Sequence, residues 1–388
     1  MTSAIRRHLA ISRAVVALLL AVIAVPASAQ QDRSFRLGFT PLPPVYSNFG
    51  RGIVYNYISA AADLVSHTLQ DGVPWNEALL SSDWRTYPSS LRSKWSELAA
   101  YDSYFIPNHA RYVSIHPINY AYDGLAEYWG EQPAMPLPAP WSSLRFNNSF
   151  VKLAYLNYAI ATVEFFHPAY LGLGVESNIL LARAPQVWGD YKELNAFVYT
   201  ELKRRYPDLV IFSSVQYEHM LGLLHDSNSL LQQVGAWWPT VLEDEVASLM
   251  HHSDLLVLST YPYMAYGAQQ NRAHYDKALA MSARTGRRIA IEQTGATSES
   301  IQIYYSTLIG TEALQSAFVS MLLDLAASEH FAFVVNFVAI DYGQNYGTDA
   351  VAMTWAYTGL FRLDGSTKPA ATIWLEHLAR HLTGSPAQ

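Results

Sequence analysis

Short apolar, β-branched runs recur along this chain and alternate with segments that have the spacing of amphipathic helices. Several of these runs are apolar nearly throughout, which is typical of strands covered on both faces. Turn-forming residues bound the runs, so we expect each run to be a strand. The eight expected strands cover residues 35–39, 63–68, 112–116, 171–175, 209–213, 255–259, 288–291 and 332–337.

The segments between most of these strands predict helices. Residues 190–205 are the clearest case, because apolar residues recur at helical spacing from Leu194 to Leu202 and the segment ends before Pro207. The same pattern predicts three further helices, at residues 243–250, 274–285 and 312–328.

Strands that alternate with helices predict a parallel sheet. Eight such units in 388 residues suit the α/β fold class, as an eight-stranded (β/α)8 TIM barrel that forms a single domain over residues 30–388. An open doubly wound sheet would need a glycine-rich phosphate loop, and the sequence has none. The longest gap between strands, residues 117–169, is expected to be a long loop at the barrel mouth with a short helix before Tyr155.

The first 29 residues have the layout of a secretory signal peptide. A basic start precedes an apolar run over residues 14–25, and an A-x-A pattern follows at residues 27–29. The run is shorter than the roughly 20 apolar residues that a membrane-spanning helix needs. We therefore expect cleavage near Gln30, a periplasmic or secreted mature chain, and no stable membrane anchor.

The composition excludes several classes of function. Apolar residues make up 51% and charged residues 15%, so the chain is too apolar to be disordered. The formal net charge of −7 gives no basic footprint for nucleic acid. The chain has no cysteine, which excludes disulfides and thiolate nucleophiles, and no metal-ligand spacing is present. We expect neither a metal nor a cofactor.

Two glutamates lie where a barrel places its chemistry, at the carboxyl ends of its strands. Glu176 ends the fourth expected strand and Glu292 the seventh, so they face each other across the mouth. Glycoside hydrolysis requires such an opposed pair, one to protonate the leaving oxygen and one to attack the sugar or activate water. The structural alternative is that each glutamate pairs with a basic residue at a loop end. Glu218, at the end of the fifth strand, is the rival carboxylate.

Three segments resemble glycoside hydrolase clan A, the retaining (β/α)8 barrels with glutamates on strands four and seven. They are Gly174-Val175-Glu176, Ser259-Thr260-Tyr261-Pro262-Tyr263 and Ile291-Glu292-Gln293-Thr294-Gly295. The likeness spans residues 36–382 and is loosely that of family-53 endo-galactanases or family-113 mannanases. It implies a hydrolase of polysaccharides or oligosaccharides, with Glu176 as acid/base and Glu292 as nucleophile, and the open cleft expected at the barrel mouth indicates endo action. It also implies that the Tyr261 hydroxyl holds the nucleophile ionised.

Two positions depart from the pattern of this clan. Val175 stands where the clan has asparagine, and Phe337 stands where it has tryptophan. We expect Trp355 to fill the second space from the following loop. Asn178 lies near the first position and Tyr263 follows the sixth strand, and both are candidates to bind substrate or support the site. Tryptophans in loops are candidates to stack on sugar, namely Trp75, Trp129, Trp141, Trp237, Trp238 and Trp355.

Two histidines are further candidates for the site, and two other functions are compatible with the sequence. His116, at the end of the third strand, is a candidate to bind sugar hydroxyls or orient a carboxylate, and His67 is a weaker one. A non-catalytic glycan-binding barrel is the alternative function, because of the two departures. A metal-dependent deacetylase-like barrel is a third, which the absence of clustered ligands disfavours.

Overall fold

All eight expected strands are present in the computed structural model, which describes residues 32–223, 242–265, 270–303 and 306–383. The fifth expected strand, residues 209–213, is observed as one short strand that is followed at once by another. The strands are β1 (Arg36–Thr40), β2 (Leu64–Leu69), β3 (Ala110–Ile115), β4 (Tyr170–Gly172), β5 (Val210–Phe212), β6 (Ser214–Gln216), β7 (Leu255–Thr260), β8 (Arg288–Thr294) and β11 (Phe333–Val338).

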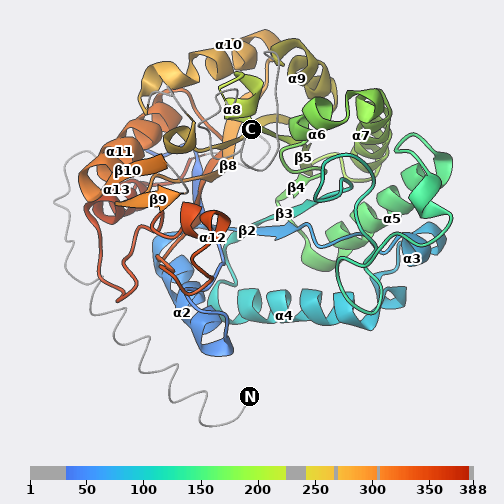
Figure 1. Ribbon diagram of the computed structural model, residues 1–388, viewed down its shortest axis with the longest axis horizontal. Coiled ribbons are helices and arrows are strands. Elements are labelled where there is room, and N and C mark those ends of the chain that lie inside the picture. Colours follow the sequence, from blue (N-terminus) through green and yellow to red (C-terminus); the bar gives the residue numbers. More distant parts are fainter. Residues whose placement is uncertain (1–31, 224–241, 266–269, 304–305, 384–388) are drawn as a thin grey trace.

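These strands form one parallel sheet that closes on itself. Its order is β5-β4-β3-β2-β1-β11-β8-β7-β6, and β5 and β6 at its two edges are separated in sequence by Ser213 alone. β5 pairs with β4 and β6 pairs with β7, so together they form the fifth strand of an eight-stranded barrel (Figure 1). The expected (β/α)8 fold is confirmed.

Helices surround the barrel on its outer side (Figure 1). The predicted segment at residues 312–328 coincides with its helix, and the one at residues 190–205 begins earlier, at Pro185, because proline fits the first turn. The helices are α2 (Asn48–Ala61), α3 (Trp75–Leu80), α4 (Ser89–Phe105), α5 (Ser149–Phe166), α6 (Asn178–Arg183), α7 (Pro185–Arg205), α8 (Tyr217–Met220), α9 (Glu243–Leu249), α10 (Asp276–Thr285), α11 (Glu312–Ser328), α12 (Ala350–Thr354) and α13 (Pro369–Leu378).

Residues 117–169 hold more regular structure than the sequence pattern suggested. The expected short helix before Tyr155 is α5, which has 18 residues and continues to Phe166. The Asn148 side chain caps it by accepting a hydrogen bond from the Phe150 N–H at 2.9 Å. Most of α5 is buried and apolar on several sides, so it lacks the one-sided pattern by which a surface helix is recognised.

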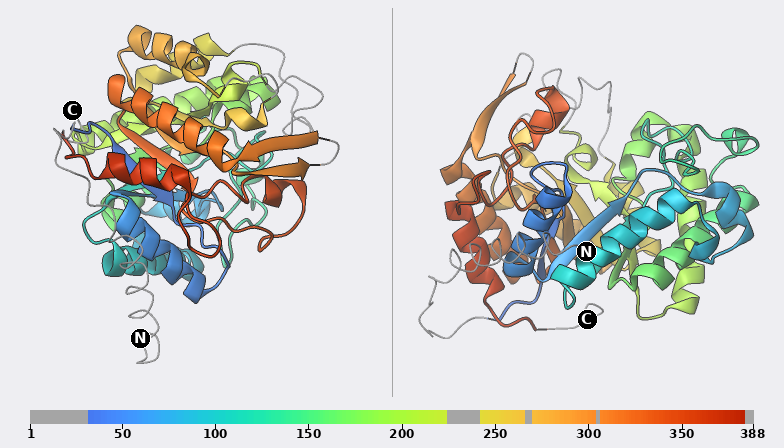
Figure 2. Two further views of the ribbon diagram at one scale, coloured as in Figure 1. Left: turned by 90° about the vertical axis from the view of Figure 1, so that its left-hand side faces the viewer. Right: turned by 90° about the horizontal axis from the view of Figure 1, so that it is seen from below.

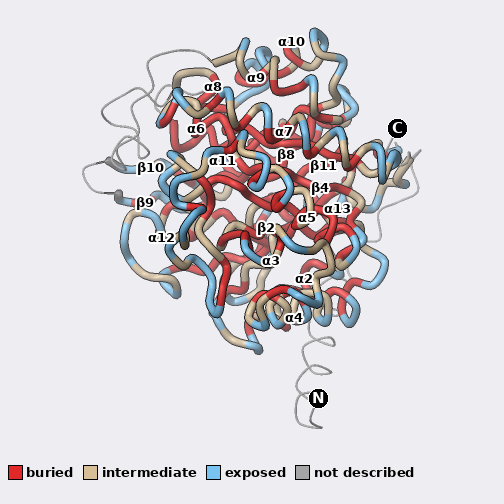
Figure 3. The backbone as a smooth tube through the Cα atoms, turned by 90° about the vertical axis from the view of Figure 1, so that its right-hand side faces the viewer, coloured by how far each residue is buried: buried red, intermediate tan, exposed pale blue. Residues whose placement is uncertain are grey.

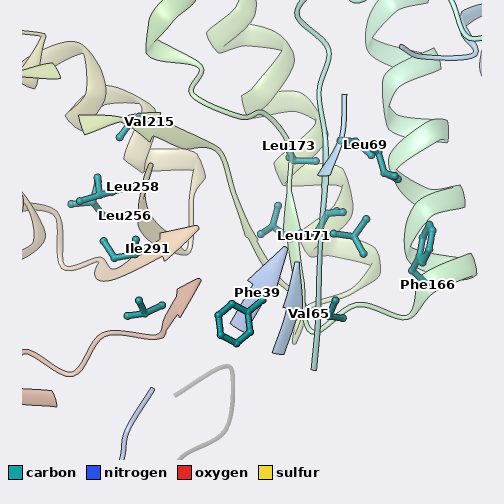
Figure 4. Packing of buried hydrophobic residues seen from close by; sticks show 14 of the residues in the cluster. Phe39, Val65, Leu69, Phe166, Leu171, Leu173, Val215, Leu256, Leu258 and Ile291 are labelled. Atoms are coloured by element: carbon teal, nitrogen blue, oxygen red, sulfur yellow. The ribbon is translucent and has the colours of Figure 1, made fainter. Parts of the chain in front are cut away.

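The core has two layers, one inside the barrel and one between the strands and the helices. Alternate strand residues point inward, where the rings of Tyr112 and Phe333 lie 5.5 Å apart. The intervening residues, among them Phe39, Val65 and Leu171, face the helices (Figure 4). Figure 3 shows the buried positions concentrated along the strands and the inner sides of the helices.

One element was not expected from the sequence. β9 (Glu299–Ile303) and β10 (Ser306–Thr311) form an antiparallel hairpin between β8 and α11, and it lies beside α12 (Figure 2). Within the described residues, no helix is both long and apolar enough to cross a bilayer. The predicted signal peptide lies outside the described residues.

Candidate active site

Both predicted glutamates lie at the carboxyl-terminal rim of the barrel and meet at one serine. The Ser214 hydroxyl, on β6, donates a hydrogen bond to Oε1 of Glu292. The hydroxyl oxygen of Ser214 in turn accepts a hydrogen bond from the Glu176 N–H at 2.9 Å. Glu176, which follows the fourth strand of the barrel, and Glu292, near the end of the seventh, therefore share a contact on the fifth.

A β-bulge positions Glu292. Along β7 and β8, Leu258 pairs with Ile291 and Ser259 pairs with Gln293, so Glu292 is the extra residue. Such a bulge re-aims one side chain of a strand. The Glu292 carboxyl reaches across the barrel, where its Oε2 accepts a hydrogen bond from the Tyr112 hydroxyl on β3, and its residue is 1% exposed.

Glu176 is held in a backbone conformation that residues other than glycine rarely adopt. Its φ of 49° is left-handed, which costs about 1–2 kcal/mol. Non-glycine residues in such conformations cluster at functional sites, where the surrounding structure holds them. Here the Ser214 hydroxyl holds the main chain, and Oε1 of the side chain accepts a hydrogen bond of 2.6 Å from the Ser259 hydroxyl.

Burial raises the pKa of both carboxyls to about 7. For Glu292, the hydroxyls of Ser214 and Tyr112 oppose this rise and the charge of Glu176 adds to it. For Glu176, the Ser259 hydroxyl opposes the rise and the charge of Glu218 adds to it. Hydrogen bonds to a carboxylate favour its ionised form, and Glu292 accepts them from two hydroxyls whereas Glu176 accepts one from Ser259.

Glu218 has a fixed position behind this pair. One of its oxygens accepts hydrogen bonds from Thr260 Oγ1 at 2.6 Å and His274 Nε2 at 3.0 Å. The other accepts from Gln216 Nε2 at 2.7 Å and from the Tyr261 N–H at 3.2 Å. With four donors on a carboxyl that is 1% exposed, Glu218 acts on the site through its charge.

His116 lies beside the glutamates and holds the segment that leads to Glu176. Its Nδ1 accepts a hydrogen bond of 3.0 Å from the N–H of Val175, the residue that replaces the asparagine of clan A. Burial lowers the pKa of His116 to about 3, so the ring is neutral and carries its proton on Nε2. Nε2 has no partner among the described residues, and the ring packs against Tyr122 at 5.5 Å.

Tyr261 and Asn178, two of the expected supporting residues, form hydrogen bonds with groups other than the two glutamates. The Tyr261 hydroxyl lies 3.5 Å from Gln293 Oε1 and does not bind Glu292; because of the bulge, Tyr112 and Ser214 supply those hydrogen bonds. Asn178 is fully buried, and both polar atoms of its amide bind the main chain of Gln216. It fixes the start of α6 against β6.

Aromatic side chains form one wall near the ends of β7 and β11. Tyr261, Tyr263 and Met264 cluster there with Phe337 and Trp355. The Trp355 ring lies 5.8 Å from Phe337 and 6.0 Å from Tyr261, which is the place expected for it beside the eighth strand. The Tyr263 hydroxyl donates to the carbonyl of Thr354 at 2.9 Å and so ties this wall together.

The remaining sequence candidates lie elsewhere. Trp75, Trp129 and Trp141 are at most 2% exposed and belong to the core, while residues 237 and 238 lie outside the described residues. His67 points away from the mouth, and its Nε2 lies 3.0 Å from Asp102 on α4.

Three residues of the site were not predicted: Tyr112, Ser214 and Tyr122. Tyr122 follows β3 with a φ of 54°, and the charges of Glu176 and Glu292 add to the burial that raises the pKa of its hydroxyl. Tyr112 had a signal in the sequence, because it and His116 fall on the same face of a strand with a period of two. Ser214 had none, since it depends on the break in the fifth strand.

No group of three or more potential ligands is arranged to hold a metal ion in the described part of the chain. The described acidic residues of the site bind hydroxyl, amide and imidazole groups instead.

Comparison with known proteins places the fold among glycoside hydrolase barrels. No protein-family model matches the chain, and no curated protein matches it in sequence. A fungal β-1,4-galactanase matches with 15% identity over 82% of this chain and 90% of its own (TM-score 0.53). A family-5, subfamily-18 enzyme from Streptomyces cattleya, solved with GlcNAc, matches with 12% identity over 90% and 81% (TM-score 0.59).

An exo-β-1,4-mannosidase from an Opitutaceae bacterium, strain TAV5, also matches, with 12% identity over 92% of this chain and 62% of its own (TM-score 0.57). The fold expected from the resemblance to clan A is therefore confirmed. At these identities the likeness shows the fold, and the chemistry depends on the residues of the site.

Proposed function

We propose that this protein is a retaining glycoside hydrolase that cleaves a polysaccharide or oligosaccharide by double displacement. The observation that carries the proposal is the approach of two glutamates at the rim of the barrel, where the Ser214 hydroxyl binds both the carboxyl of buried Glu292 and the main-chain N–H of Glu176. Glu176 follows the fourth strand of the barrel and Glu292 lies near the end of the seventh, as in the clan, and we assign them opposite protonation states: Glu292, with two hydroxyl donors, ionised, and Glu176, with one, protonated.

The chemistry follows from those protonation states. Glu292, ionised by its two hydroxyl donors, attacks the anomeric carbon while protonated Glu176 donates its proton to the departing glycosidic oxygen. The C–O bond breaks and a glycosyl ester forms on Glu292. Glu176, now a carboxylate, removes a proton from water, and the water attacks the anomeric carbon and releases Glu292.

The finer parts of the proposal concern substrate and location. The galactanase and mannosidase among the structural neighbours favour a β-1,4-linked substrate. We propose endo action, and the size distribution of early products tests it, because an exo enzyme releases one product size from the start. We also propose export through the N-terminal segment, which is tested by fractionating cells that express the full chain.

Mechanism-based labelling tests the proposed function. The protein is incubated with 2-deoxy-2-fluoro-glycosyl fluorides of galactose, mannose and glucose, and its peptides are weighed. We expect one sugar mass on the peptide that contains Glu292. The Glu292→Gln variant should not be labelled. The Glu176→Gln variant should still be labelled, because fluoride leaves without a proton.

Labelling of Glu218, or no label together with no hydrolysis of β-1,4-linked galactan, mannan or glucan, would refute the assignment. Val175 and Phe337, which replace the asparagine and tryptophan of the clan, favour one second candidate, a non-catalytic glycan-binding barrel. Binding of these glycans without turnover or labelling would support it.

A further inference from the structure

A pocket lies at the barrel rim, and neither of the two glutamates lines it. β1 and β2 pair at only two positions, Gly38 with Leu64 and Phe39 with Val65. Past these positions the two strands share no pairing, and a cavity of about 200 Å³ is lined by the ends of both strands together with α2 and α4. This volume is below the roughly 300–1,000 Å³ of sites for drug-sized ligands, so it suits a single small ring.

Two hydroxyls that line the pocket have no partner in the described part of the chain. Ser66 on β2 is fully buried, and Thr40 at the end of β1 has a buried hydroxyl oxygen. A buried polar group without a hydrogen bond costs free energy, and native structures rarely leave one unpaired. Both hydroxyls are therefore placed for a ligand that can both donate and accept hydrogen bonds.

The wall of the pocket near α2 and α4 contains aromatic rings and charged side chains. The rings of Tyr55 and Tyr101 stack at 5.1 Å, and Tyr46 at the outer edge is 67% exposed. Lys94 also lines the pocket and forms no ion pair with any described residue, whereas Arg51 pairs with Glu97. Aromatic rings beside uncommitted hydroxyls and an ammonium group match a sugar, which has apolar ring faces and a rim of hydroxyls.

One loop connects this pocket with the glutamates. Asp71, which lines the pocket, accepts a hydrogen bond of 2.9 Å from the Tyr120 hydroxyl. Two residues further on, Tyr122 packs against His116 and lies within the electrostatic reach of both Glu176 and Glu292. The loop between these tyrosines thus forms part of both sites.

We propose that the pocket between β1 and β2 is a second carbohydrate-binding site that holds one sugar unit. The proposal rests on the proposed function for the class of ligand, and on Ser66, Thr40, Lys94 and the tyrosine wall for the site. The sugar comes either from the chain being cleaved or from a separate molecule, and the two sources differ in their effect on kinetics.

Titration calorimetry measures oligosaccharide binding to the full-length protein that carries Glu292→Gln, a substitution that prevents turnover of the probe. The probes are β-1,4-linked tetra- and hexasaccharides of galactose, mannose and glucose. The Glu292→Gln protein is compared with four variants of it that also carry Ser66→Ala, Lys94→Met, both of these substitutions, or Ser253→Ala. Ser253 is the matched control, because it is equally buried but its hydroxyl donates to the Leu255 carbonyl at 2.6 Å, at the other end of the barrel.

We expect Ser66→Ala to weaken binding of the best probe about 3- to 10-fold, which is the effect of one hydrogen bond. It should not lower the melting temperature, because the hydroxyl has no protein partner to lose. Ser253→Ala should lower the melting temperature and leave binding unchanged. Equal affinity in Ser66→Ala and in the parent protein, or a loss of stability as large as that in Ser253→Ala, would overturn the proposal.

Kinetics in the otherwise wild-type chain then separates the two sources of sugar. If Ser66→Ala lowers kcat/KM for the hexasaccharide more than for the tetrasaccharide, the sugar belongs to the chain being cleaved. If binding weakens with kcat/KM unchanged, the sugar comes from a separate molecule. Binding without any hydrolysis or labelling would refute the proposed function and leave this site supported.

Discussion

The hydrogen bond from Tyr112 to Glu292 makes a sharp prediction about the dependence of activity on pH. Tyr112→Phe removes the hydroxyl but keeps the ring, which packs against Phe212 at 5.2 Å and Phe333 at 5.5 Å. The fold should therefore persist. Glu292 would keep Ser214 as its hydroxyl donor, so its ionised form would be less stable than in the wild type.

The size of the effect follows from the strength of a hydrogen bond to a charged group. Such a bond contributes about 1.5–3 kcal/mol, and one pKa unit corresponds to about 1.4 kcal/mol. Tyr112→Phe should thus raise the pKa of Glu292 by about 1–2 units. The attack requires Glu292 ionised, so the acid limb of kcat/KM should move to higher pH by that amount and the maximum should fall.

The assay is kcat/KM against pH from 4 to 9, on the glycoside whose 2-fluoro analogue labels the protein. Tyr261→Phe is the control, because the Tyr261 hydroxyl lies near Gln293 rather than on Glu292. Its acid limb should coincide with that of the wild type. The reasoning is refuted if Tyr112→Phe leaves the acid limb in place, or if Tyr261→Phe moves it equally.

Three further variants test the charges of the site and of the fold. Glu218→Gln removes a negative charge that raises the pKa of Glu176, so the alkaline limb of kcat/KM should move to lower pH; an unmoved limb contradicts this. Glu176→Gln removes a carboxyl whose pKa is raised to about 7 in the fold, from an ordinary value of 4.5. That carboxyl stabilises the fold below pH 4.5, and this contribution is lost as the pH rises to 7. Urea unfolding should show similar stability at pH 4.5 and a gain of about 3 kcal/mol at pH 8, whereas an equal difference at both pH values would contradict the shift. Lys368→Met leaves buried Asp341 without its ion-pair partner at 2.7 Å and should cost about 3–5 kcal/mol, part of which Asp341→Asn in the same chain should restore.

The sequence determined the strands well because burial on both faces leaves a continuous apolar run. Residues 255–259 and 332–337 are such runs, and they coincide with β7 and β11 to within a residue at each end. The hairpin of β9 and β10 was missed because one face is exposed. Ile301 on β9 is 2% exposed and Ile309 on β10 is 61% exposed, and polar residues interrupt the apolar ones in both strands, so neither strand is a continuous apolar run.

The sequence predicted which residues lie at the site, because that depends on their position along a strand. It did not predict which groups bind the Glu292 carboxyl, because that depends on the direction in which the side chain points. Glu176 and Glu292 follow continuous apolar runs in the sequence, and the structure places both at the carboxyl-terminal side of the barrel, Glu176 just after β4 and Glu292 near the end of β8. The donors to Glu292 depend on a bulge between β7 and β8, which no local pattern of residues announces. Tyr261 is close to Glu292 along the rim, but the bulge turns the carboxyl toward Tyr112 instead.

The break in the fifth strand links closure of the barrel to assembly of the site. β5 ends at Phe212 on the β4 side, and β6 begins at Ser214 on the β7 side. The main chain of Ser214 still binds both flanks of Glu176, since its N–H donates to the Gly174 carbonyl and its carbonyl accepts from the Ser177 N–H, each at 2.9 Å. Its side chain meanwhile reaches Glu292. The Ser214 hydroxyl thus joins the carboxyl of Glu292 to the main chain of Glu176, so the contact between the two glutamates forms at the break where the barrel closes.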